Sequence, residues 1–475
     1  MPGTFLGVEI ARRALSAQQR AVDITGHNIA NANTKGYSRQ VASLKATDGY
    51  TLAGFDRPTA AGLIGTGVDL NSIERMRDGF VDLQIRKESL AQGRWEARQK
   101  ALEQVELIVA EPSESGLRAA LDGFWQSLED LAQTPESDAA RSVVRQQAVA
   151  LTDLFRSTYG QLDELRSSVD QDIRTKVGEI NVLASQVAAL NVQITKAESM
   201  GNQANDLKDQ RDLAINKLSK MVNLTVGAGP MGTVSLSIQG ATLVELGTFR
   251  AMRAEPDAAN NGMVRITWET SGADVGLTGG ELKGLLEIRD GDLGRYMADL
   301  NTLASGLATE INTVHRAGYG LDGLSNRDFF AANDGSATVD ARNIAVSPGV
   351  AANPQWIAAA SVANAPGDGS NALKMAAKLD EKVLSSNTIG LRDFYGSLIS
   401  SIGVDANQAS DMARNQTTLV DHLEQLGQSV SGVSLDEEMT NLIRYQQGYQ
   451  AAARVMNTMD EMLDLMVNRL GLAGR

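Results

Sequence analysis

The sequence predicts a mainly α-helical protein with a β insertion. It would have coiled-coil-like helices at the N- and C-termini, a domain of bundled long helices and a small β-rich domain. Two long stretches, 136–229 and 367–475, contain no proline, a residue that helices exclude from their interior. Apolar residues recur in both stretches at steps of three and four, which is the helical period. The middle of the chain instead carries many glycines and short β-branched runs, which are typical of strands.

Composition and charge argue against several classes of function. The 475 residues are 43% hydrophobic and 4% aromatic, with 44 Lys and Arg against 58 Asp and Glu. A net charge of −14 disfavours nucleic acid or an anionic membrane as main partner, because phosphate binding needs clustered cations. There is no cysteine, which excludes disulfides and thiolate chemistry. No apolar run is long enough to span a bilayer, and Glu9, Arg12 and Arg13 interrupt the N-terminal segment, unlike a secretory signal.

The first expected element is a helix over residues 4–31. Leu15, Val22 and Ile29 are seven residues apart, so they form one apolar stripe along it. The polar, glycine-containing turn NANTKGYSRQ follows.

Two further helices are expected before the β insertion. Residues 82–110 form a helix that stops before Pro112, and residues 139–199 form one or two long helices. On the first helix the expected buried face is Leu83, Leu90, Ala97, Ala101, Val105 and Ile108. On the second the apolar stripe is Leu162, Leu165, Val169, Ile173, Val177, Ile180, Ala184, Val187, Leu190 and Ile194.

The sequence pattern changes from helical to strand-like at about residue 221. MVNLTV, TVSLSIQ, ATLVEL and MVRITWE, between residues 221 and 269, are expected to be strands joined by turns. Residues 281–316 return to a helical pattern. Residues 317–385 are rich in Gly, Ala, Asn and Asp, and we expect loops with short elements there.

The C-terminal helix has the clearest seam. Its apolar residues follow a strict three-four spacing over four heptads, with Ser434 as the expected N-cap, Glu437 completing a capping box and Gly471 as the stop. The seam consists of Leu442, Tyr445, Tyr449, Ala452, Met456, Met459, Leu463, Met466 and Leu470. Such a face requires partner helices, from this chain or from neighbouring copies.

The motifs that resemble chemical sites are better explained structurally. GAGPMG, Gly227 to Gly232, matches a dinucleotide-binding pattern, but a strand-like run follows it where that motif requires a helix, so a hairpin turn is expected. The Asp290/Asp292 pair lacks the spacing of a calcium loop. Asp436, Glu437 and Glu438 lie in the first turn of a predicted helix, where carboxylates favour the helix dipole. His315 and His422 are expected to be structural. No catalytic, cofactor-binding or metal-binding residue is predicted.

The candidate functional residues are therefore those of the two terminal seams. Terminal segments are ordinarily frayed unless another element holds them, so apolar stripes at both ends favour an assembly role. The candidate assembly residues are Leu15, Val22, Ile29, Leu442, Tyr449, Met456, Leu463 and Leu470.

Both ends of the chain carry a family resemblance. ALSAQQRAVDITGHNIANANTKGYSRQ and VSGVSLDEEMTNLIRYQQGYQAAARVMNTMDEMLDLMVNRLG resemble the opening and closing segments of flagellar rod, hook and hook-associated proteins. GYSRQ (36–40), SGVSLDEEM (431–439), NDLKDQRD (205–212) and GGELKGLLEIRD (279–290) are similar to the hook-associated protein 1 branch of that family. Lys35 and His27 depart from the pattern, which commonly has proline and asparagine there.

The resemblance implies a structural, non-enzymatic protein without cofactors, which joins hook to filament by self-assembly through its terminal helices. Its implied partners are copies of itself in a ring, the flagellar hook protein, a second hook-associated protein and a cytoplasmic export chaperone at the C-terminal helix. Neither nucleic acid nor membrane is expected as a partner. The implied location is the extracellular flagellum, reached through the flagellar type III apparatus without a cleaved Sec signal. The implied domains are an inner assembly domain (1–45 and 430–475), an α-helical bundle (46–221, 279–317 and 386–429) and an outer β-rich, irregular insertion (222–278 and 318–385).

Two alternatives remain. The first is a hook or distal-rod subunit of the same family, which the long helical middle disfavours because hook proteins are mainly β between their terminal helices. The second is a flagellum-associated hydrolase, which would need paired carboxylates or a nucleophile with a base.

Overall fold

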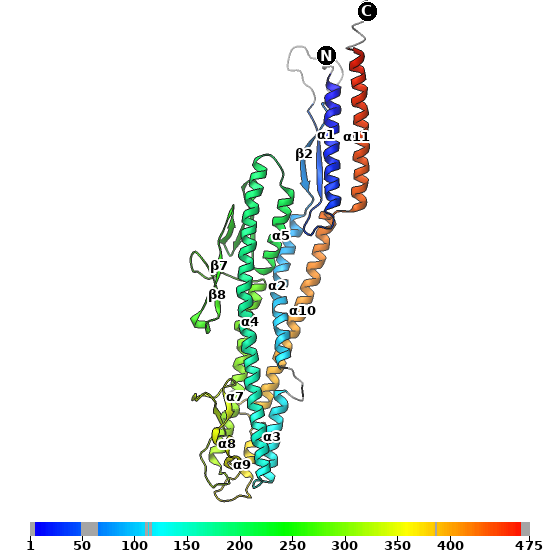
Figure 1. The fold of residues 1–475 in the computed structure, drawn as a ribbon. Coiled ribbons are helices and arrows are strands. Elements are labelled where there is room, and N and C mark those ends of the chain that lie inside the picture. The colour runs from blue at the N-terminus through cyan, green and yellow to red at the C-terminus, as the bar shows by residue number, and fades with distance from the viewer. Residues whose placement is uncertain (1–4, 49–64, 110–112, 114–115, 385–386, 467–475) are drawn as a thin grey trace, which may run out of the picture. The chain divides into compact units, whose positions relative to one another are not determined.

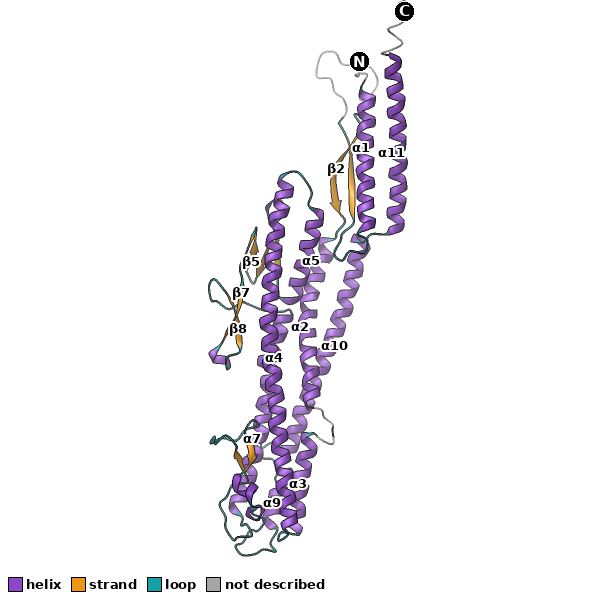
Figure 2. Cartoon of the chain, in the orientation of Figure 1, coloured by secondary structure: helices purple, strands orange, loops and turns teal. Residues whose placement is uncertain are grey.

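The computed structural model describes residues 5–48, 65–109, 113, 116–384 and 387–466. The chain divides into two compact units. Unit 1 comprises Met1–Ser89, Ile180–Ala251 and Thr418–Arg475, and unit 2 comprises Leu90–Glu179 and Met252–Thr417. Three long helices contribute residues to both units: α2 (Gly79–Val109), α4 (Asp138–Ser199) and α10 (Leu391–Ser431). Helices dominate and strands form small sheets (Figure 2), which confirms the predicted fold class.

The two terminal helices of unit 1 pack side by side. α1 (Leu6–Ala30) and α11 (Leu435–Asp464) run antiparallel, so that the start of α1 and the end of α11 lie at the same end of the pair (Figure 1). An antiparallel ribbon of β1 (Gln40–Ala46) and β2 (Val68–Arg75) packs on α1, with a register shift between Ser43 and Leu44. The sequence analysis did not predict this ribbon.

The rest of unit 1 contains α5 (Asn205–Met221) and an antiparallel sheet in the order β3-β4-β5-β6. The strands are β3 (Thr225–Ala228), β4 (Val234–Ile238), β5 (Ala241–Glu245) and β6 (Thr248–Phe249). GAGPMG forms the β3–β4 connection through a 3₁₀ turn, Pro230–Gly232, which confirms the hairpin. The predicted strand MVNLTV is wrong in its first half, because α5 continues to Met221 and β3 begins only at Thr225.

Unit 2 combines helices with two short ribbons. Glu281–Ala317 is helical throughout, as predicted, with a π-helical turn between α6 and α7. The elements are α3 (Leu117–Gln133), β7 (Met252–Pro256), β8 (Val264–Trp268), α6 (Glu281–Leu286), the π turn (Glu287–Asp292), α7 (Leu293–Ala317), β9 (Phe330–Ala332), β10 (Ile344–Val346), α8 (Pro348–Ala352) and α9 (Ser370–Ala377), with 3₁₀ turns at Ala258–Asn260 and Pro354–Trp356. β7 pairs with β8, and β9 pairs with β10.

The cores follow the predicted stripe of α4 fully and that of α2 in part, since Leu90 and Ile108 are half-buried. All ten stripe residues of α4 are buried, and α4 is one continuous helix. On α2, however, Leu83 is 63% exposed, which corrects its predicted place on the buried face. The α2 residues that pack with Leu423 of α10 are Val81 and Ile85, which lie one turn apart. Leu83 is two residues from each, and therefore points away from that contact.

Two buried side chains of unit 2, Arg141 and His315, make hydrogen bonds to the backbone of the segment after α7. The guanidinium of Arg141 donates to the carbonyl oxygens of Pro135 (2.9 and 2.6 Å) and Ile357 (2.6 Å), and burial lowers its pKa to about 10. His315 is 1% exposed; its Nε2 accepts the N–H of Ala358 at 3.0 Å, so its Nδ1 donates to the Arg327 carbonyl at 2.8 Å. Burial lowers the pKa of His315 to about 4. These groups fasten the irregular segment after α7.

Candidate assembly interface

The surface of α1 that is buried in unit 1 is made of small and polar residues. Its buried positions are Ala11, Ala17, Ala21, Thr25 and Asn28. Such small side chains let a neighbouring element approach the helix backbone closely. The three predicted seam residues of α1, Leu15, Val22 and Ile29, are each half-buried. The predicted stripe is therefore only partly covered within the chain.

The predicted seam residues of α11 are similarly incomplete in their burial. Leu442, Met456 and Leu463 are half-buried, Tyr449 is 40% exposed, and Leu470 lies outside the described residues. The structure thus brings the seams of α1 and α11 onto two packed helices, without enclosing either seam.

α11 also carries exposed apolar side chains, both on this seam and outside it. Of its 30 residues, only Glu438 is buried. The large apolar side chains that are exposed on α11 and on the two residues after it are Leu435, Met439, Ile443, Tyr449, Val455, Met462, Leu465 and Met466. Several methionines among them are flexible, polarisable side chains suited to packing against varied surfaces. A helix with so little of its apolar surface buried has capacity for further helix contacts.

The base of the helix pair is held by a buried carboxylate. Glu438 is 2% exposed and accepts hydrogen bonds from Arg39 Nε at 2.8 Å and Asn28 Nδ2 at 3.0 Å. Arg39 also donates to both carboxylate oxygens of Glu437, at 2.9 and 3.1 Å, and its backbone N–H donates to Ser431 O at 2.8 Å. Burial alone would lower the pKa of Arg39, but the hydrogen bonds and charges of the two glutamates raise it overall. Arg39 therefore fastens the start of α11 as a cation.

Asn28 connects α1 to the same base. Its Oδ1 accepts from the backbone N–H of Gln40 at 3.0 Å and from the hydroxyl of Tyr37 at 2.8 Å, and its Nδ2 also donates to Gln40 O at 2.8 Å. Burial raises the pKa of Tyr37, so its hydroxyl stays protonated and can donate. One buried amide thus fixes the end of α1 against the loop that leads into β1.

The loop into β1 is in turn held by acidic residues of α5. Asp209 accepts from the backbone N–H and hydroxyl of Ser38, at 2.8 and 2.7 Å, and from Arg75 at 2.7 Å. Gln40 donates to Asp206 at 2.7 Å. Arg75 and Arg77 both donate to Asp212 at 2.9 Å. Asp209 is 5% exposed, and its pairing with Arg75 and Ser38 satisfies the buried charge.

These contacts unite three segments that are far apart in sequence. GYSRQ, NDLKDQRD and SGVSLDEEM meet through Ser38–Asp209, Arg39–Glu437 and Arg39–Glu438. We call the residues of these three segments that contact one another the joint cluster. The segments were noticed in the sequence only as family signatures. The acidic residues of NDLKDQRD and SGVSLDEEM, opposite the arginine of GYSRQ, were the available signal of a shared polar contact.

Comparisons with known proteins assign the chain to a family. Residues 102–330 match the flagellar hook-associated protein FlgK helical domain. Residues 9–37 match the flagella basal body rod protein family, and residues 428–470 match the flagellar basal body rod FlgEFG protein C-terminal family. A flagellar hook-associated protein 1 from Bacillus subtilis strain 168 is 36% identical over 509 aligned positions, with 100% of both chains covered.

The chain belongs to the flagellar hook-associated protein 1 family.

Other members of this family align over nearly the same length. Flagellar hook-associated protein 1 of Salmonella typhimurium strain LT2 is 28% identical, and that of Escherichia coli K12 is 27% identical; both alignments cover 96% of this chain and 98% of the relative. The solved structure of the flagellar hook junction protein FlgK from Burkholderia pseudomallei superposes with a TM-score of 0.65 at 18% identity, covering 73% of this chain and 100% of that chain. The structural likeness supports the fold.

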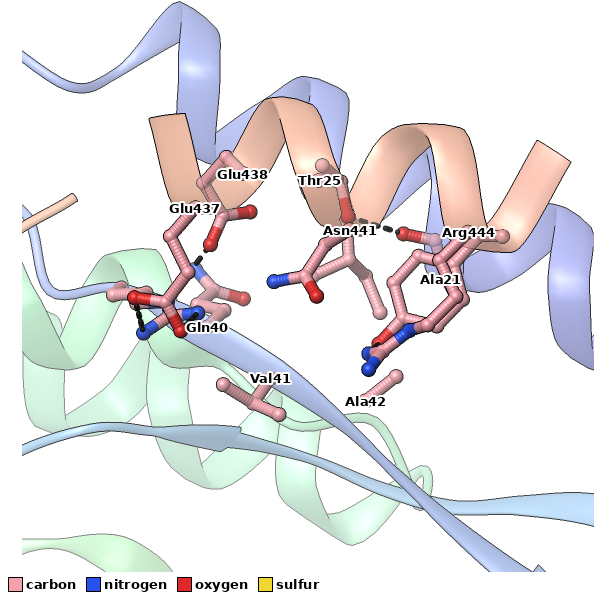
Figure 3. A pocket seen from close by; sticks show the side chains of 12 residues that line it. Ala21, Thr25, Gln40, Val41, Ala42, Glu437, Glu438, Asn441 and Arg444 are labelled. Atoms are coloured by element: carbon pink, nitrogen blue, oxygen red, sulfur yellow. Dashed lines mark hydrogen bonds and ion pairs between the residues drawn. The ribbon is translucent and has the colours of Figure 1, made fainter. Parts of the chain in front are cut away.

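Within this hook-associated protein 1 fold, a cavity of about 260 Å³ adjoins the joint cluster (Figure 3). Its wall comes from α1, β1, the residue before β1, and α11. The side chains that line it are Ala21, Ile24, Thr25, Arg39, Gln40, Val41, Ala42, Glu437, Glu438, Asn441, Arg444 and Tyr445. Both glutamates are paired with Arg39, and Arg444 lies over the ring of Tyr445 at 5.0 Å. The two glutamates are therefore engaged with Arg39, and Arg444 with the ring of Tyr445.

Four of the acidic groups considered in the sequence analysis, Asp290, Asp292, Glu437 and Glu438, are engaged in ion pairs. Asp290 accepts from Arg289 at 2.7 and 2.8 Å, and Asp292 accepts from Arg98 at 2.8 Å. The predicted capping box at the start of α11 is wrong in its chemistry: Ser434 is the N-cap residue but makes no capping hydrogen bond. Glu437 turns instead to Arg39. Within the described ranges no three metal-ligating side chains gather to hold an ion, and no helix there is long and apolar enough to cross a membrane.

Proposed function

We propose that this protein is a structural component of the bacterial flagellum that joins hook to filament by self-assembly through α1 and α11. The observation that supports this most is the state of α11, a 30-residue helix with one buried residue and a run of exposed apolar side chains. Each such side chain contributes about 1.5–3 kcal/mol when a neighbour buries it fully. Family membership and the match of both terminal segments to rod-protein families agree with this role.

Residues 1–45 and 430–475 would form the inner assembly domain. The candidate assembly residues named from the sequence lie in these segments, and half-burial of most of them leaves apolar area for neighbouring helices. Residues 46–221, 279–317 and 386–429 would form the surrounding helical bundle, and 222–278 with 318–385 the outer insertion.

The proposed partners follow from the family and from the same surface. They are copies of this chain in a ring, the hook protein and a second hook-associated protein, with a cytoplasmic chaperone on the C-terminal helix before export. The proposed route is the flagellar type III apparatus, and the proposed location is the extracellular flagellum. The exposed apolar residues of α11 are a reason for a chaperone, because such a surface aggregates if it is left uncovered.

A deletion strain tests the junction role. Loss of the gene should leave complete hooks without filaments, with filament subunits released into the medium. A hook or distal-rod subunit would instead leave no complete hook. Normal filaments in the deletion strain would refute the junction role.

Complementation then tests the α11 surface. A variant carrying Ile443→Gln and Met462→Gln should fold but fail to restore filaments, because it removes apolar area that neighbours would bury. Leu373→Gln on α9 is the matched control, since Leu373 is also exposed but lies outside the terminal helices. Full restoration by the double variant would contradict the proposed role of α11. The purified chain should release nothing from cell-wall peptidoglycan, and measurable release would revive the hydrolase alternative.

A further inference from the structure

Two glycines face large side chains across the contact between α1 and α11. A β-carbon added to Gly7 of α1 would lie 2.8 Å from Sδ of Met459 on α11. A β-carbon added to Gly448 of α11 would lie 2.9 Å from Cδ of Gln18 on α1. Each glycine therefore leaves the space that the opposite side chain occupies. We call these two contacts the glycine notches.

The notches are matched in spacing. Gln18 follows Gly7 by eleven positions on α1, and Met459 follows Gly448 by eleven positions on α11. Eleven residues are three helical turns, so the members of each set lie on the same face of their helix. Because the helices are antiparallel, both notches are filled together in one register.

Beyond the joint cluster, where Glu438 accepts from Asn28 and Arg39 at the base of the pair, the apolar contacts between α1 and α11 select a register weakly. Within α11 the buried positions include no apolar residue, and the buried apolar positions of α1 are alanines. A shift of one heptad would bring Asn441 or Val455 opposite Gln18 in place of Gly448, which is the one glycine of α11. Apolar burial therefore differs little between the native register and one shifted by a heptad. Steric fit at the two glycine notches does distinguish them.

The Gln18 contact acts through shape. Its Oε1 is buried and has no hydrogen-bond partner among the described residues. A polar side chain in a helix seam is a known way to specify register at some cost in stability. The buried oxygen carries that cost, and the space above Gly448 is what makes the arrangement possible.

We propose that Gly7 and Gly448 are positioning residues that fix the register and rotation of α11 on α1. They would thereby decide which α11 side chains face a neighbouring molecule. This inference rests on the proposed assembly role of the helix pair, and names the residues that set its geometry.

Chemical cross-linking of the full chain measures the register directly, since the chain contains no cysteine. Gln19 and Tyr449 are both exposed and each directly follows a notch residue, which places them on the same side of the antiparallel pair, so Gln19→Cys with Tyr449→Cys reports the native register. Gln19→Cys with Met456→Cys reports a register shifted by one heptad. A short bis-maleimide is the probe, and the yield of intramolecular cross-link is the readout.

Gly448→Leu is the test variant, because the end of Gln18 can swing away from a single methyl but not from a leucine. It should reduce the native cross-link roughly tenfold, as expected for overpacking a close contact, and raise the shifted one. Gly26→Leu is the control: Gly26 lies on α1 with no atom within 4 Å of an added β-carbon. Leucine favours helix over glycine at both positions, so propensity cannot explain a loss at 448 alone.

Adding Gln18→Ala to Gly448→Leu should restore the native cross-link, since it removes the opposing side chain. An unchanged cross-link in Gly448→Leu, or an equal loss in Gly26→Leu, would overturn the notch proposal whether or not filaments form. Failure of Gln18→Ala to restore the cross-link would likewise contradict it. If the native cross-link is lost but the variant still restores filaments to the deletion strain, the notches set the register and the proposed assembly role of the pair is wrong.

Discussion

Arg39→Ala should detach the start of α11 from the joint cluster. The substitution leaves the Glu438 carboxylate, 2% exposed, with Asn28 as its remaining hydrogen-bond donor. Removing one partner of a buried ion pair costs about 3–5 kcal/mol, because an uncompensated charge stays buried. The Asn28 amide still donates at 3.0 Å, which places the expected loss at the lower end, about 3 kcal/mol. The exposed Glu437 contact adds about 0–1 kcal/mol.

Amide hydrogen exchange on the full chain measures this loss where it arises. A change of about 3 kcal/mol corresponds to roughly a hundredfold increase in the opening equilibrium at the start of α11. Exchange in α7 should stay unchanged and serves as the internal reference. Arg12→Ala is the matched arginine control, since Arg12 pairs with Glu9 on the exposed surface of α1 and should leave α11 exchange unaltered.

A second substitution separates charge from packing. Glu438→Gln combined with Arg39→Ala should recover part of the lost protection, because it removes the orphaned charge while keeping an acceptor for Asn28. If Arg39→Ala accelerates exchange at α11 no more than Arg12→Ala does, the joint cluster does not hold the helix and the reasoning is refuted.

Two further predictions concern unit 2. His315 has a pKa lowered to about 4 in the folded chain, so its contribution is fully present above pH 6.5 and is lost as pH falls from 6.5 to 4, by about 3 kcal/mol in total. His315→Asn should flatten this part of the pH profile of unfolding free energy, and an unchanged slope would contradict the assignment. Arg141→Lys should lower the free energy of unfolding by about 2–4 kcal/mol, because lysine cannot reach three carbonyl contacts with one planar fork. Denaturant unfolding checks it, and parental stability would show that charge alone suffices there.

Local periodicity was enough to predict most of the helices. The ten-residue stripe of α4 is buried along its whole length, since a three-four repeat sustained over many turns has one stable outcome. The β1–β2 ribbon was missed because its alternation is weak: β1 runs from a buried to an exposed end, and its partner lies more than twenty residues away. Short strands of this kind are defined by their pairing and by the helix beneath them.

The joint cluster could not be predicted from spacing. Ser38 and Asp209 are 171 positions apart, and Arg39 and Glu437 are 398 apart. The local rule at the start of α11 predicted a capping box, and tertiary contact overrode it when Glu437 paired with Arg39. Arg39 is already held beside Glu437 by its ion pair with the buried Glu438. For Glu437, pairing with Arg39 is therefore more favourable than a local capping hydrogen bond.

Four consecutive residues, 37–40, hold three helices of unit 1. Tyr37 is attached to α1, Ser38 to α5, Arg39 to α11, and Gln40 to both α1 and α5. A twisting force on the helix pair therefore passes into α5 through charged hydrogen bonds, and the covalent turn before α11 need not carry it. Water competes for these hydrogen bonds wherever it reaches them. The connection between the helices should therefore loosen first at Arg39, which lines the cavity.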